Sequence, residues 1–447
     1  MEKEYDLIIV GSGLYGCVTA YLAHQAGWRC LVIEKRAFTG GNIRDEIREG
    51  INVHSYGPHV FHTRHQEVWD FASRFTPFNH FRYCPLARYG GKMYNLPFNM
   101  HTFYQLYGTQ TPEEAALRLR QEQGLYPHPR NLEEKAVSMV GRTMYETLIK
   151  GYTEKQWGRK ATELPPFIIE RLPLRFTFDN NYFNDPYQGV PMAGYSPWVD
   201  KMLEGTEVRL NTDFLADKDY WMKKAGHVLY TGAIDAFFDY RLGALEYRSL
   251  TFEHVLFEQP NVQGIAVINE TDSRIPYTRS IEHKHFAFGT QPVSIVTHEF
   301  PQTWDKDREP FYPVNDEKNN TLYRQYHALA QRECPHITFG GRLGLYRYFN
   351  MDETIKNALE QWEVLKTKLL PVWIQAGSNF VFCPFLNLIL RKARNHPCPH
   401  RKPDKPSLRE YSQKPFPAQY LILGLLPRDR KPTGKLYKYT FSSFKLV

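Results

Sequence analysis

The chain has 447 residues, of which 42% are hydrophobic and 15% aromatic, as in a globular protein large enough for two or three domains. Its apolar runs are all shorter than the roughly 18 residues of a membrane-spanning helix, and the charged start MEKEYD predicts no signal peptide. The six cysteines lack metal-ligand spacing, so we expect reduced thiols, no metal site and a cytoplasmic location.

The net charge of +8 is unevenly distributed. Residues 377–447 carry a net charge of +11, whereas residues 1–376 carry a net charge of −3. The body of the chain therefore lacks the basic excess of a nucleic-acid-binding domain, and we expect no nucleic-acid partner for it.

Residues 6–42 have the pattern of a dinucleotide-binding unit. The apolar run 7–10 predicts a buried parallel strand, the sequence GSGLYG follows it, and a helix to about residue 26 leads to a second strand at 30–33. This order predicts a helix whose N-terminus faces a pyrophosphate.

Each glycine of the turn has a predicted role. Gly11 permits the tight turn, Gly13 lets the backbone approach the pyrophosphate, and Gly16 lets the helix pack closely on the strand. Glu34 ends the second strand, where it can accept hydrogen bonds from a ribose. The alternative, an ordinary glycine turn before a helix, would leave Glu34 as a coincidence.

The residues after Glu34 bear on which dinucleotide is bound. Arg36 and the pair Gly40-Gly41 follow the acid closely. Such a glycine pair is typical of the flavoprotein form of this unit, in which FAD lies extended, and we favour FAD over NAD on this ground.

Two histidines follow a short strand pattern in residues 51–63. His59 and His62 come after Gly57-Pro58, which predicts a loop. No neighbouring Cys or carboxylate cluster completes a metal site. The histidines are therefore either packed side chains or contacts of a flavin.

Residues 64–76 have apolar side chains at helical spacing, which predicts a helix. A β-hairpin is predicted next, across Gly90-Gly91, and helical patterns dominate after it. From about 100 to 150, Thr111 begins a capping box, and Asn131 is a second candidate cap. We expect a small helical insertion that forms one wall of a cleft.

The segment 151–195 is rich in aromatic residues, Pro, Gly and Arg and has little periodicity. Such irregular segments are often lids or binding loops. Trp157 and Tyr182 are candidates to stack on a base, and Arg171 and Arg175 are candidates to bind phosphate. A surface loop with packed aromatic residues is the alternative.

The rest of the body predicts strands at 206–211, 227–231 and 337–341, with an alternating, antiparallel pattern over 245–300. Arg279 lies inside one of these strands, where it either points into a cleft or is an ordinary strand residue. Asn350 and Asp352 are candidate caps of a helix that ends near residue 370.

We therefore predict an α/β chain: an FAD-binding, Rossmann-type doubly wound domain with a helical insertion and an antiparallel β-sheet domain. The predicted segments are 1–98, 196–245 and 331–376 for the FAD-binding core, 99–150 for the helical insertion, 151–195 for a mobile lid or linker, 246–330 for the antiparallel substrate domain, and 377–447 for a basic, Pro-rich tail.

From about residue 5 to 370 the chain closely resembles the bacterial UDP-galactopyranose mutases. The motifs that carry the resemblance are GSGLYG, EKR followed by GGN, YGPHVFHT, NLPFNM, KGYTEKQWG, RLPLRFTFDNNYF, ALEYRSL, IPYTR, EHKHF, YPV and GGRLGLYRYFNMD. Several are long and specific, which excludes chance.

The resemblance implies an isomerase that interconverts UDP-galactopyranose and UDP-galactofuranose and supplies galactofuranose for cell-surface polysaccharide. It implies reduced FAD used without net redox change, with flavin N5 attacking the anomeric carbon, displacing UDP and holding the sugar covalently while its ring is exchanged. It further implies an external reductant for the flavin and a homodimer.

The resemblance also assigns roles to single residues. Arg171 and Arg279 match a pair that holds the diphosphate, and His62 is a further catalytic candidate. The implied substrate contacts are Asn79, Tyr152, Trp157, Tyr182, Tyr312 and Tyr348. The implied cofactor contacts are Gly11, Gly13, Gly16, Glu34, Arg36, Gly41, Asn42, His59, Arg342 and Met351.

Two departures accompany the resemblance. Asn350 stands where relatives often have an aspartate, and Leu148 or Ile149 stands where some have a phenylalanine that stacks on uracil. The tail 377–447 is not covered, and three interpretations stay open: an extension that binds a membrane surface or a partner, a disordered appendage, or a segment without selected function.

Two rival functions stay open. A flavin oxidoreductase would share the N-terminal unit but need an apolar substrate channel, against which the Arg- and Tyr-rich segment 151–195 argues. A non-catalytic protein that holds FAD structurally is the second rival, with Asn350 and the tail as its sequence hints.

Overall fold

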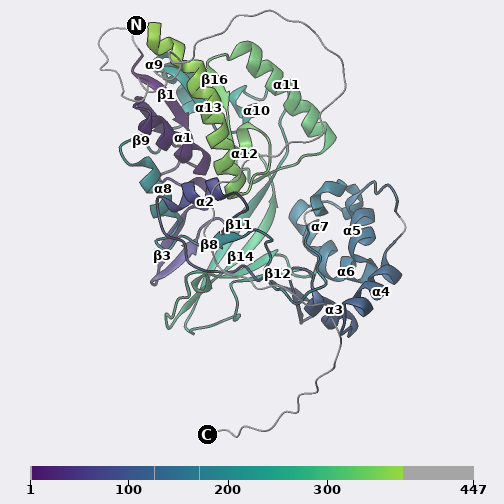
Figure 1. Cartoon of the computed structure of the whole chain (residues 1–447). Coiled ribbons are helices and arrows are strands. Elements are labelled where there is room, and N and C mark those ends of the chain that lie inside the picture. The colour runs from purple at the N-terminus through teal and green to yellow at the C-terminus, as the bar shows by residue number, and fades with distance from the viewer. Residues whose placement is uncertain (1–2, 125, 171, 376–447) are drawn as a thin grey trace, which may run out of the picture. The chain divides into compact units, whose positions relative to one another are not determined.

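The computed structural model describes residues 3–124, 126–170 and 172–375 of the chain, which belong to one compact unit (Figure 1). The N-terminal half of this unit begins a five-stranded parallel sheet with the order β16-β10-β1-β2-β9. Its strands are β1 (Tyr5–Val10), β2 (Cys30–Ile33), β9 (Glu207–Arg209), β10 (Ala225–Tyr230) and β16 (Ile337–Phe339). The predicted strands at 7–10 and 30–33 are therefore confirmed.

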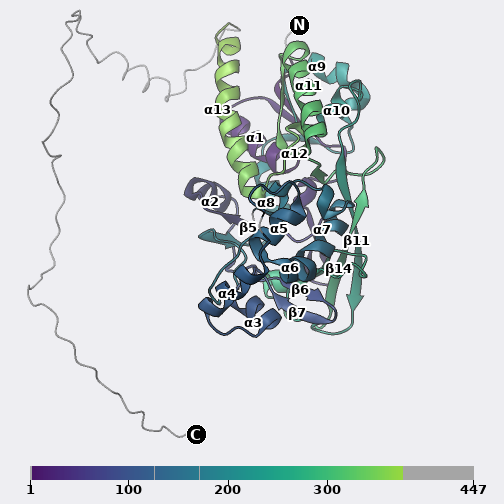
Figure 2. The ribbon, with the colours of Figure 1, turned by 90° about the vertical axis from the view of Figure 1, so that its right-hand side faces the viewer.

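Both faces of this sheet are covered by helices, because the strands are apolar on both sides. In β1, Leu7 and Ile9 pack in one core, and Tyr5 and Ile8 pack in another. Helix α1 packs against α8 and α13 on the first side, whereas α11 supplies residues to the second core (Figure 2). The helices around the sheet are α1 (Leu14–Gln25), α2 (Gln66–Ser73), α8 (Tyr195–Leu203), α9 (Lys218–Lys224), α10 (Ile234–Phe237), α11 (Glu317–Glu333), α12 (Gly341–Gly344) and α13 (Met351–Gln375).

A second sheet of seven strands has the order β15-β11-β14-β13-β12-β6-β7. Neighbouring strands in it are antiparallel, except that β12 and β6 pair in parallel. Its strands are β6 (Leu86–Tyr89), β7 (Lys92–Asn95), β11 (Tyr247–Phe257), β12 (Val267–Glu270), β13 (Arg279–Glu282), β14 (Ser294–Thr303) and β15 (Tyr312–Pro313). With the parallel sheet, it confirms the predicted fold class.

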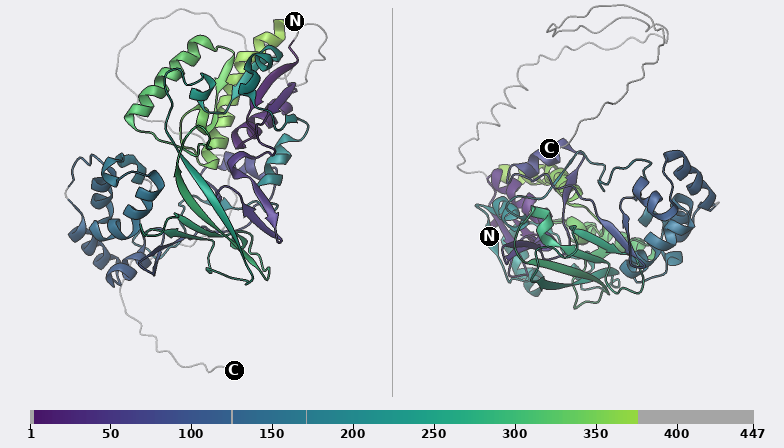
Figure 3. Two further views of the ribbon diagram at one scale, coloured as in Figure 1. Left: turned by 180° about the vertical axis from the view of Figure 1, so that it is seen from behind. Right: turned by 90° about the horizontal axis from the view of Figure 1, so that it is seen from below.

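A group of helices with its own apolar core lies beside the β6–β7 end of this sheet (Figure 3). Thr111 caps α4 in the predicted capping box with Glu114, and Asn131 accepts from the backbone N–H of Glu134 at the start of α5. The helices are α3 (Met100–Tyr107), α4 (Pro112–Glu122), α5 (Leu132–Val140), α6 (Arg142–Met144), a π-helix (Tyr145–Lys150) and α7 (Gly151–Trp157).

Three predicted boundaries differ from the structure. The π-helix runs directly into α7, so the helical group does not end at residue 150 and its core extends to Ile169. The hairpin β6–β7 joins the seven-stranded sheet, although it lies within the segment 1–98. The predicted sheet segment 246–330 contains most of α11, which begins at Glu317 behind an Asp316 cap.

Two short antiparallel sheets complete the body: the hairpin of β3 (Asp45–Arg48) with β4 (Ile51–His54), and the pairing of β5 (Phe61–Thr63) with the distant β8 (Tyr187–Gly189). The loop between β4 and β5 carries His59, whereas His62 is the middle residue of β5 and pairs with Gln188 of β8, so the prediction of a loop at His62 was wrong. Over the described ranges, none of the helices combines the length and apolar character needed to cross a bilayer.

Candidate active site

A cavity of about 1470 Å³ extends from the first glycine turn to α7. Its walls come from the ends of the parallel strands, the histidine loop, β13, the segment before β15 and the start of α13. The predicted site residues that line it are Gly11, Gly13, Glu34, Arg36, Gly41, Asn42, His59, His62, Tyr152, Trp157, Tyr182, Arg279, Tyr312, Arg342, Tyr348 and Met351.

One end of the cavity has the shape of a dinucleotide cradle. Gly13 precedes α1 without any side-chain cap, so the first-turn N–H groups of the helix are open to the cavity. A Cβ atom added to Gly13 would meet nothing within 4 Å, which shows that the backbone there borders open space. The second glycine pair joins this turn, because the N–H of Gly40 donates to the carbonyl of Ser12 at 2.9 Å.

Glu34 is oriented by its own chain. Its Oε2 atom accepts from the N–H and the hydroxyl of Ser12, both at 2.8 Å, and its Oε1 atom accepts from the N–H of Arg36 at 2.9 Å. The carboxylate is 5% exposed and lines the cavity, so Oε1 retains the capacity to accept from a ribose hydroxyl.

Arg36 and Asn42 form a wall of the same end. Nε of Arg36 donates to Glu309 at 3.0 Å, and its Nη2 donates to the side chain of Asn42 at 3.2 Å. The guanidinium also lies 5.1 Å from the ring centre of Tyr56. These contacts tie the segment before β15 to the end of β2.

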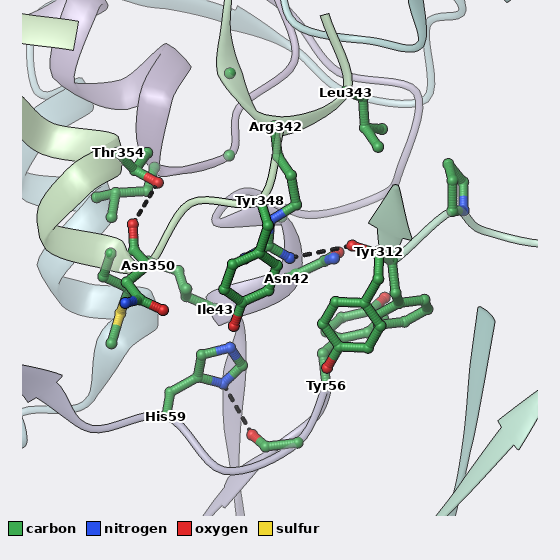
Figure 4. A pocket seen from close by; sticks show the side chains of 18 of the residues that line it. Asn42, Ile43, Tyr56, His59, Tyr312, Arg342, Leu343, Tyr348, Asn350 and Thr354 are labelled. Atoms are coloured by element: carbon green, nitrogen blue, oxygen red, sulfur yellow. Dashed lines mark hydrogen bonds between the residues drawn. The ribbon is translucent and has the colours of Figure 1, made fainter. Parts of the chain in front are cut away.

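The histidine loop faces the middle of the cavity. Nδ1 of His59 lies 2.8 Å from the carbonyl of Gly57 (Figure 4), and burial lowers the pKa of His59 to about 3. The ring is therefore neutral with its proton on Nδ1, which leaves Nε2 as an acceptor. His62 stacks on Phe183 at 3.6 Å between ring centres, and its Nδ1 lies 2.7 Å from Asp185.

Arg279 lies at the centre of a ring of tyrosines. Its Nε atom donates to the hydroxyl of Tyr152 at 3.1 Å and lies 3.5 Å from Oε1 of Glu299. In the part of the chain that the structure describes, its two Nη atoms have no hydrogen-bond partner. A guanidinium held by one nitrogen and open at the other two is suited to bind a phosphate or carboxylate.

Three tyrosines around Arg279 stay protonated at neutral pH. Burial raises the pKa of Tyr182 to about 12 and also raises the pKa values of Tyr83 and Tyr312. Their hydroxyls can therefore donate hydrogen bonds to an anion. The ring of Tyr348 lies 5.8 Å from that of Tyr312 (Figure 4).

Arg342 is held by its own surroundings. Its Nη1 and Nη2 atoms donate to the carbonyls of Phe311 and Phe349 at 3.3 and 2.9 Å, and its guanidinium lies 4.9 Å from the ring centre of Tyr348. It thereby fixes Tyr348 and the chain before β15 in place.

The start of α13 closes this side of the cavity. Asn350 directly precedes the helix, and its N–H donates to Oε2 of Glu353 at 2.9 Å. Asp352 lies inside the first turn rather than at the cap, and within the described residues its Oδ1 atom is buried without a partner.

Three predicted residues within the described ranges, namely Gly16, Asn79 and Arg175, do not line the cavity. Gly16 is packed, since a Cβ there would come within 2.0 Å of the carbonyl oxygen of Gly11. Arg175 donates to the backbone of Asn181 and Tyr182, so it orders its own loop. Arg171 lies outside the described residues.

Asn79 differs from its predicted contact with substrate. Its Nδ2 donates to the carbonyl of Phe286 at 2.8 Å, and its Oδ1 accepts from the N–H groups of Phe81 and Val190 at 3.1 and 2.9 Å. These bonds use the carbonyl oxygen twice and one N–H of the amide, and Asn79 is not part of the cavity lining, so in the structure it joins three chain segments.

Sequence reasoning missed several residues of the cavity. Gln156 and Asn269 line it, and within the described ranges their side-chain carbonyl oxygens are buried without a partner. Gln156 belongs to a face that also includes Leu148, Ile149, Tyr152, Thr153 and Trp157, spaced at four-residue intervals. That spacing was the available signal, although it is obscured because a π-helix precedes α7.

Comparisons with known proteins agree with this architecture. The family model for UDP-galactopyranose mutase matches residues 147–348, and a model for an NAD(P)-binding Rossmann-like domain matches residues 9–75. A solved structure of reduced UDP-galactopyranose mutase has a TM-score of 0.61 at 14% identity, over 81% of this chain and 95% of that chain. A putrescine oxidase structure has a TM-score of 0.51 at 12% identity, over 81% and 99% of the chains.

The alignments with curated relatives cover nearly the full length of each relative. The dTDP-fucopyranose mutase of Escherichia coli is 38% identical over 79% of this chain and 96% of the relative. A probable UDP-galactopyranose mutase of Klebsiella pneumoniae is 37% identical over 79% and 93%. The UDP-galactopyranose mutase of Mycoplasma genitalium is 30% identical over 81% and 95%. The chain therefore belongs to the UDP-galactopyranose mutase family and is an isomerase.

Proposed function

We propose that this isomerase interconverts UDP-galactopyranose and UDP-galactofuranose with FAD, which is active when reduced. The observation that carries the proposal is Arg279, whose open Nη atoms face the same cavity as the glycine cradle. A dinucleotide and an anionic sugar nucleotide would thus share one enclosure. The structural likeness to a reduced UDP-galactopyranose mutase supports the fold that this requires.

The chain's own residues divide the work of binding. Gly11, Gly13 and the start of α1 would hold the pyrophosphate of the cofactor, and Glu34 its ribose. Arg279 would bind the diphosphate of the sugar nucleotide and offset the charge that develops as UDP leaves. Arg171 as the second diphosphate ligand stays a prediction from the resemblance.

The reaction requires orientation more than acid–base power. Reduced FAD, when bound, supplies a nucleophilic nitrogen for the anomeric carbon. Exchange of the ring moves one proton from the 4-hydroxyl to the former ring oxygen, so no net redox change occurs. The neutral His59 and the His62–Asp185 pair border the middle of the cavity, where they would orient the reacting groups and exclude water.

The test is conversion of UDP-galactofuranose by the purified full chain, with and without dithionite, followed by chromatography of the products. Conversion to UDP-galactopyranose under reducing conditions alone is the expected result. Stoichiometric consumption of reductant would instead support an oxidoreductase. Bound flavin without any turnover of a sugar nucleotide would support the non-catalytic reading.

A second candidate is the same rearrangement of a dTDP-linked 6-deoxyhexose. The observation in its favour is the dTDP-fucopyranose mutase relative, whose identity of 38% is as high as that of the Klebsiella protein at 37%. Equal amounts of UDP-galactose and dTDP-fucose in one reduced reaction would distinguish the candidates by their relative kcat/KM.

An external electron donor for the flavin, a homodimeric assembly, a cytoplasmic location and a role in cell-surface polysaccharide synthesis stay predictions from the sequence and its resemblance.

A further inference from the structure

The side-chain ammonium of Lys155 lies inside a ring of backbone carbonyl oxygens. Its Nζ atom is 2.8 Å from the oxygen of Glu270 and 2.9 Å from those of Asp272, Ile275 and Tyr277. All four carbonyls belong to the end of β12 and the turn that joins it to β13. An ammonium has three protons, so four acceptors surround it and the turn closes around one charge.

Further contacts hold α7 and the π-helix before it against this turn and against strand β11 of the same sheet. A Cβ on Gly151, at the start of the helix, would come within 2.2 Å of the carbonyl oxygen of Thr271. The hydroxyl of Thr271 donates to the carbonyl of Thr147 at 2.8 Å. At the other end of the helix, Nε of Arg248 donates to the carbonyl of Gln156 at 2.9 Å.

The turn leads directly to the anion site. Tyr277, whose carbonyl binds Lys155, precedes Arg279 by two residues. Tyr152 lies one helical turn before Lys155 and accepts the hydrogen bond from Arg279. Two contacts therefore join α7 to the chain at β13: the bond from Lys155 to the carbonyl of Tyr277 and the bond between Tyr152 and Arg279.

We propose that Lys155 is a positioning residue for the anion site, fixing α7 against β13 so that Tyr152 and Arg279 stay in contact. The ligand in question is the nucleoside diphosphate, so this role rests on the function proposed above. Lys155 itself touches no substrate, because its ammonium is enclosed by carbonyl oxygens. Its positive charge acts as a small cation would in a site built from backbone carbonyls.

The chain offers a matched control in Lys284. Its Nζ atom donates to the carbonyls of Pro260, Gln291 and Val293, and the residue is 3% exposed. Lys284 does not line the cavity. It is thus a second lysine enclosed by carbonyl oxygens, but away from the anion site.

The test compares Lys155→Met and Lys284→Met in the full chain. The probes are UDP and dTDP, whose dissociation constants are measured by calorimetry, with the melting temperature and flavin absorbance recorded for each variant. Both variants should melt at lower temperature, because each leaves buried carbonyls without a donor. Only Lys155→Met should weaken nucleotide binding, by about fivefold, the loss expected when the hydrogen bond between Tyr152 and Arg279 is broken.

The pair Lys155→Arg and Lys284→Arg decides the question if the methionine variants do not fold. A planar guanidinium keeps the charge but cannot occupy the centre of four converging carbonyls, so Lys155→Arg should also bind UDP about fivefold more weakly. Lys284→Arg should bind UDP as the wild type does. Unchanged UDP and dTDP binding in both Lys155 variants would overturn the assignment, whereas a wild-type protein that binds neither nucleotide would contradict the proposed function itself.

Discussion

The hydroxyl of Tyr152 accepts a hydrogen bond of 3.1 Å from Nε of Arg279, which joins helix α7 to strand β13 within the cavity. The bond uses the one guanidinium nitrogen that also faces Glu299, at 3.5 Å. The remaining nitrogens are thereby presented to the cavity as a fork. The first two predictions follow from this arrangement.

Arg279→Lys should weaken UDP binding by about 100-fold, or about 2–3 kcal/mol, because a lysine cannot make a bidentate contact. Calorimetry with UDP checks this, at a flavin content equal to that of the wild type. Arg118→Lys is the control, since Arg118 lies on α4 and pairs with Glu122 at the surface. A dissociation constant unchanged by Arg279→Lys would show that the anion binds elsewhere.

Tyr152→Phe should have a smaller effect. It removes one acceptor from Nε of Arg279 but leaves Glu299 in place, so we expect a loss of about 1 kcal/mol, or about fivefold in UDP affinity. Flavin binding should not change. If Tyr152→Phe weakened binding as severely as Arg279→Lys, the hydroxyl would have to contact the nucleotide directly.

Substitution of Gly13 and of Gly16 by alanine should affect different properties, namely flavin binding and folding stability. A Cβ at position 13 would enter open space at the cofactor cradle, whereas a Cβ at position 16 would collide with the carbonyl of Gly11. Gly13→Ala should therefore keep the melting temperature of the flavin-free protein but lose bound flavin. Gly16→Ala should lower the melting temperature even without flavin, by about 1–2 °C for each kcal/mol lost in a unit of this size.

Differential scanning calorimetry of flavin-free protein, with flavin absorbance of the purified variants, separates these outcomes. Full flavin content in Gly13→Ala would mean that the pyrophosphate does not approach this backbone.

Buried neutral histidines should make the fold sensitive to acid. Burial lowers the pKa of His54 to about 4 and of His59 to about 3, and the pKa of His283 falls well below its usual value for the same reason. Below pH 6.5 the unfolded chain takes up protons that the folded chain does not, so stability falls as pH falls from about 6.5 towards these values. Each histidine should cost about 2 kcal/mol by pH 5.

Urea unfolding at pH 7.5, 6 and 5 measures this slope. In His54→Gln the slope should be smaller, because one buried imidazole no longer has to be kept neutral. Equal unfolding free energies of the wild type at pH 7.5 and 5 would contradict the prediction.

Elements defined by local chemistry were predictable from the sequence. The strand 30–33 is apolar and buried on both faces, and the Thr111 capping box depends on residues three apart. The boundary at residue 150 was wrong because a π-helix carries the chain into α7 without a break. Helix α11 was missed because it is mostly polar and follows a run of strands with alternating residues.

Among the residues of the candidate site, too, some could be predicted from the sequence and others could not. The glycines of the first turn could be predicted from their spacing, and Arg279 and Tyr182 were candidates by residue type, whereas Tyr152, Tyr312 and Tyr348 came from the resemblance alone. The contacts of Asn79 with the backbone of Val190 and Phe286 could not be predicted, because these partners are far from it in sequence. Lys155 was missed for the same reason, as four main-chain oxygens leave no trace in the identity of the residues that provide them.

The π-helix before α7 determines which side chains of α7 point into the cavity. A π-turn holds one residue more than an α-turn, so the segment 145–150 acts as an insertion within an otherwise continuous helix. Each residue advances an α-helix by about 100°. Deleting one residue upstream of Gly151 would rotate the following helix by that angle, and the side chains of Tyr152, Gln156 and Trp157 would leave the cavity together although none of them had been mutated.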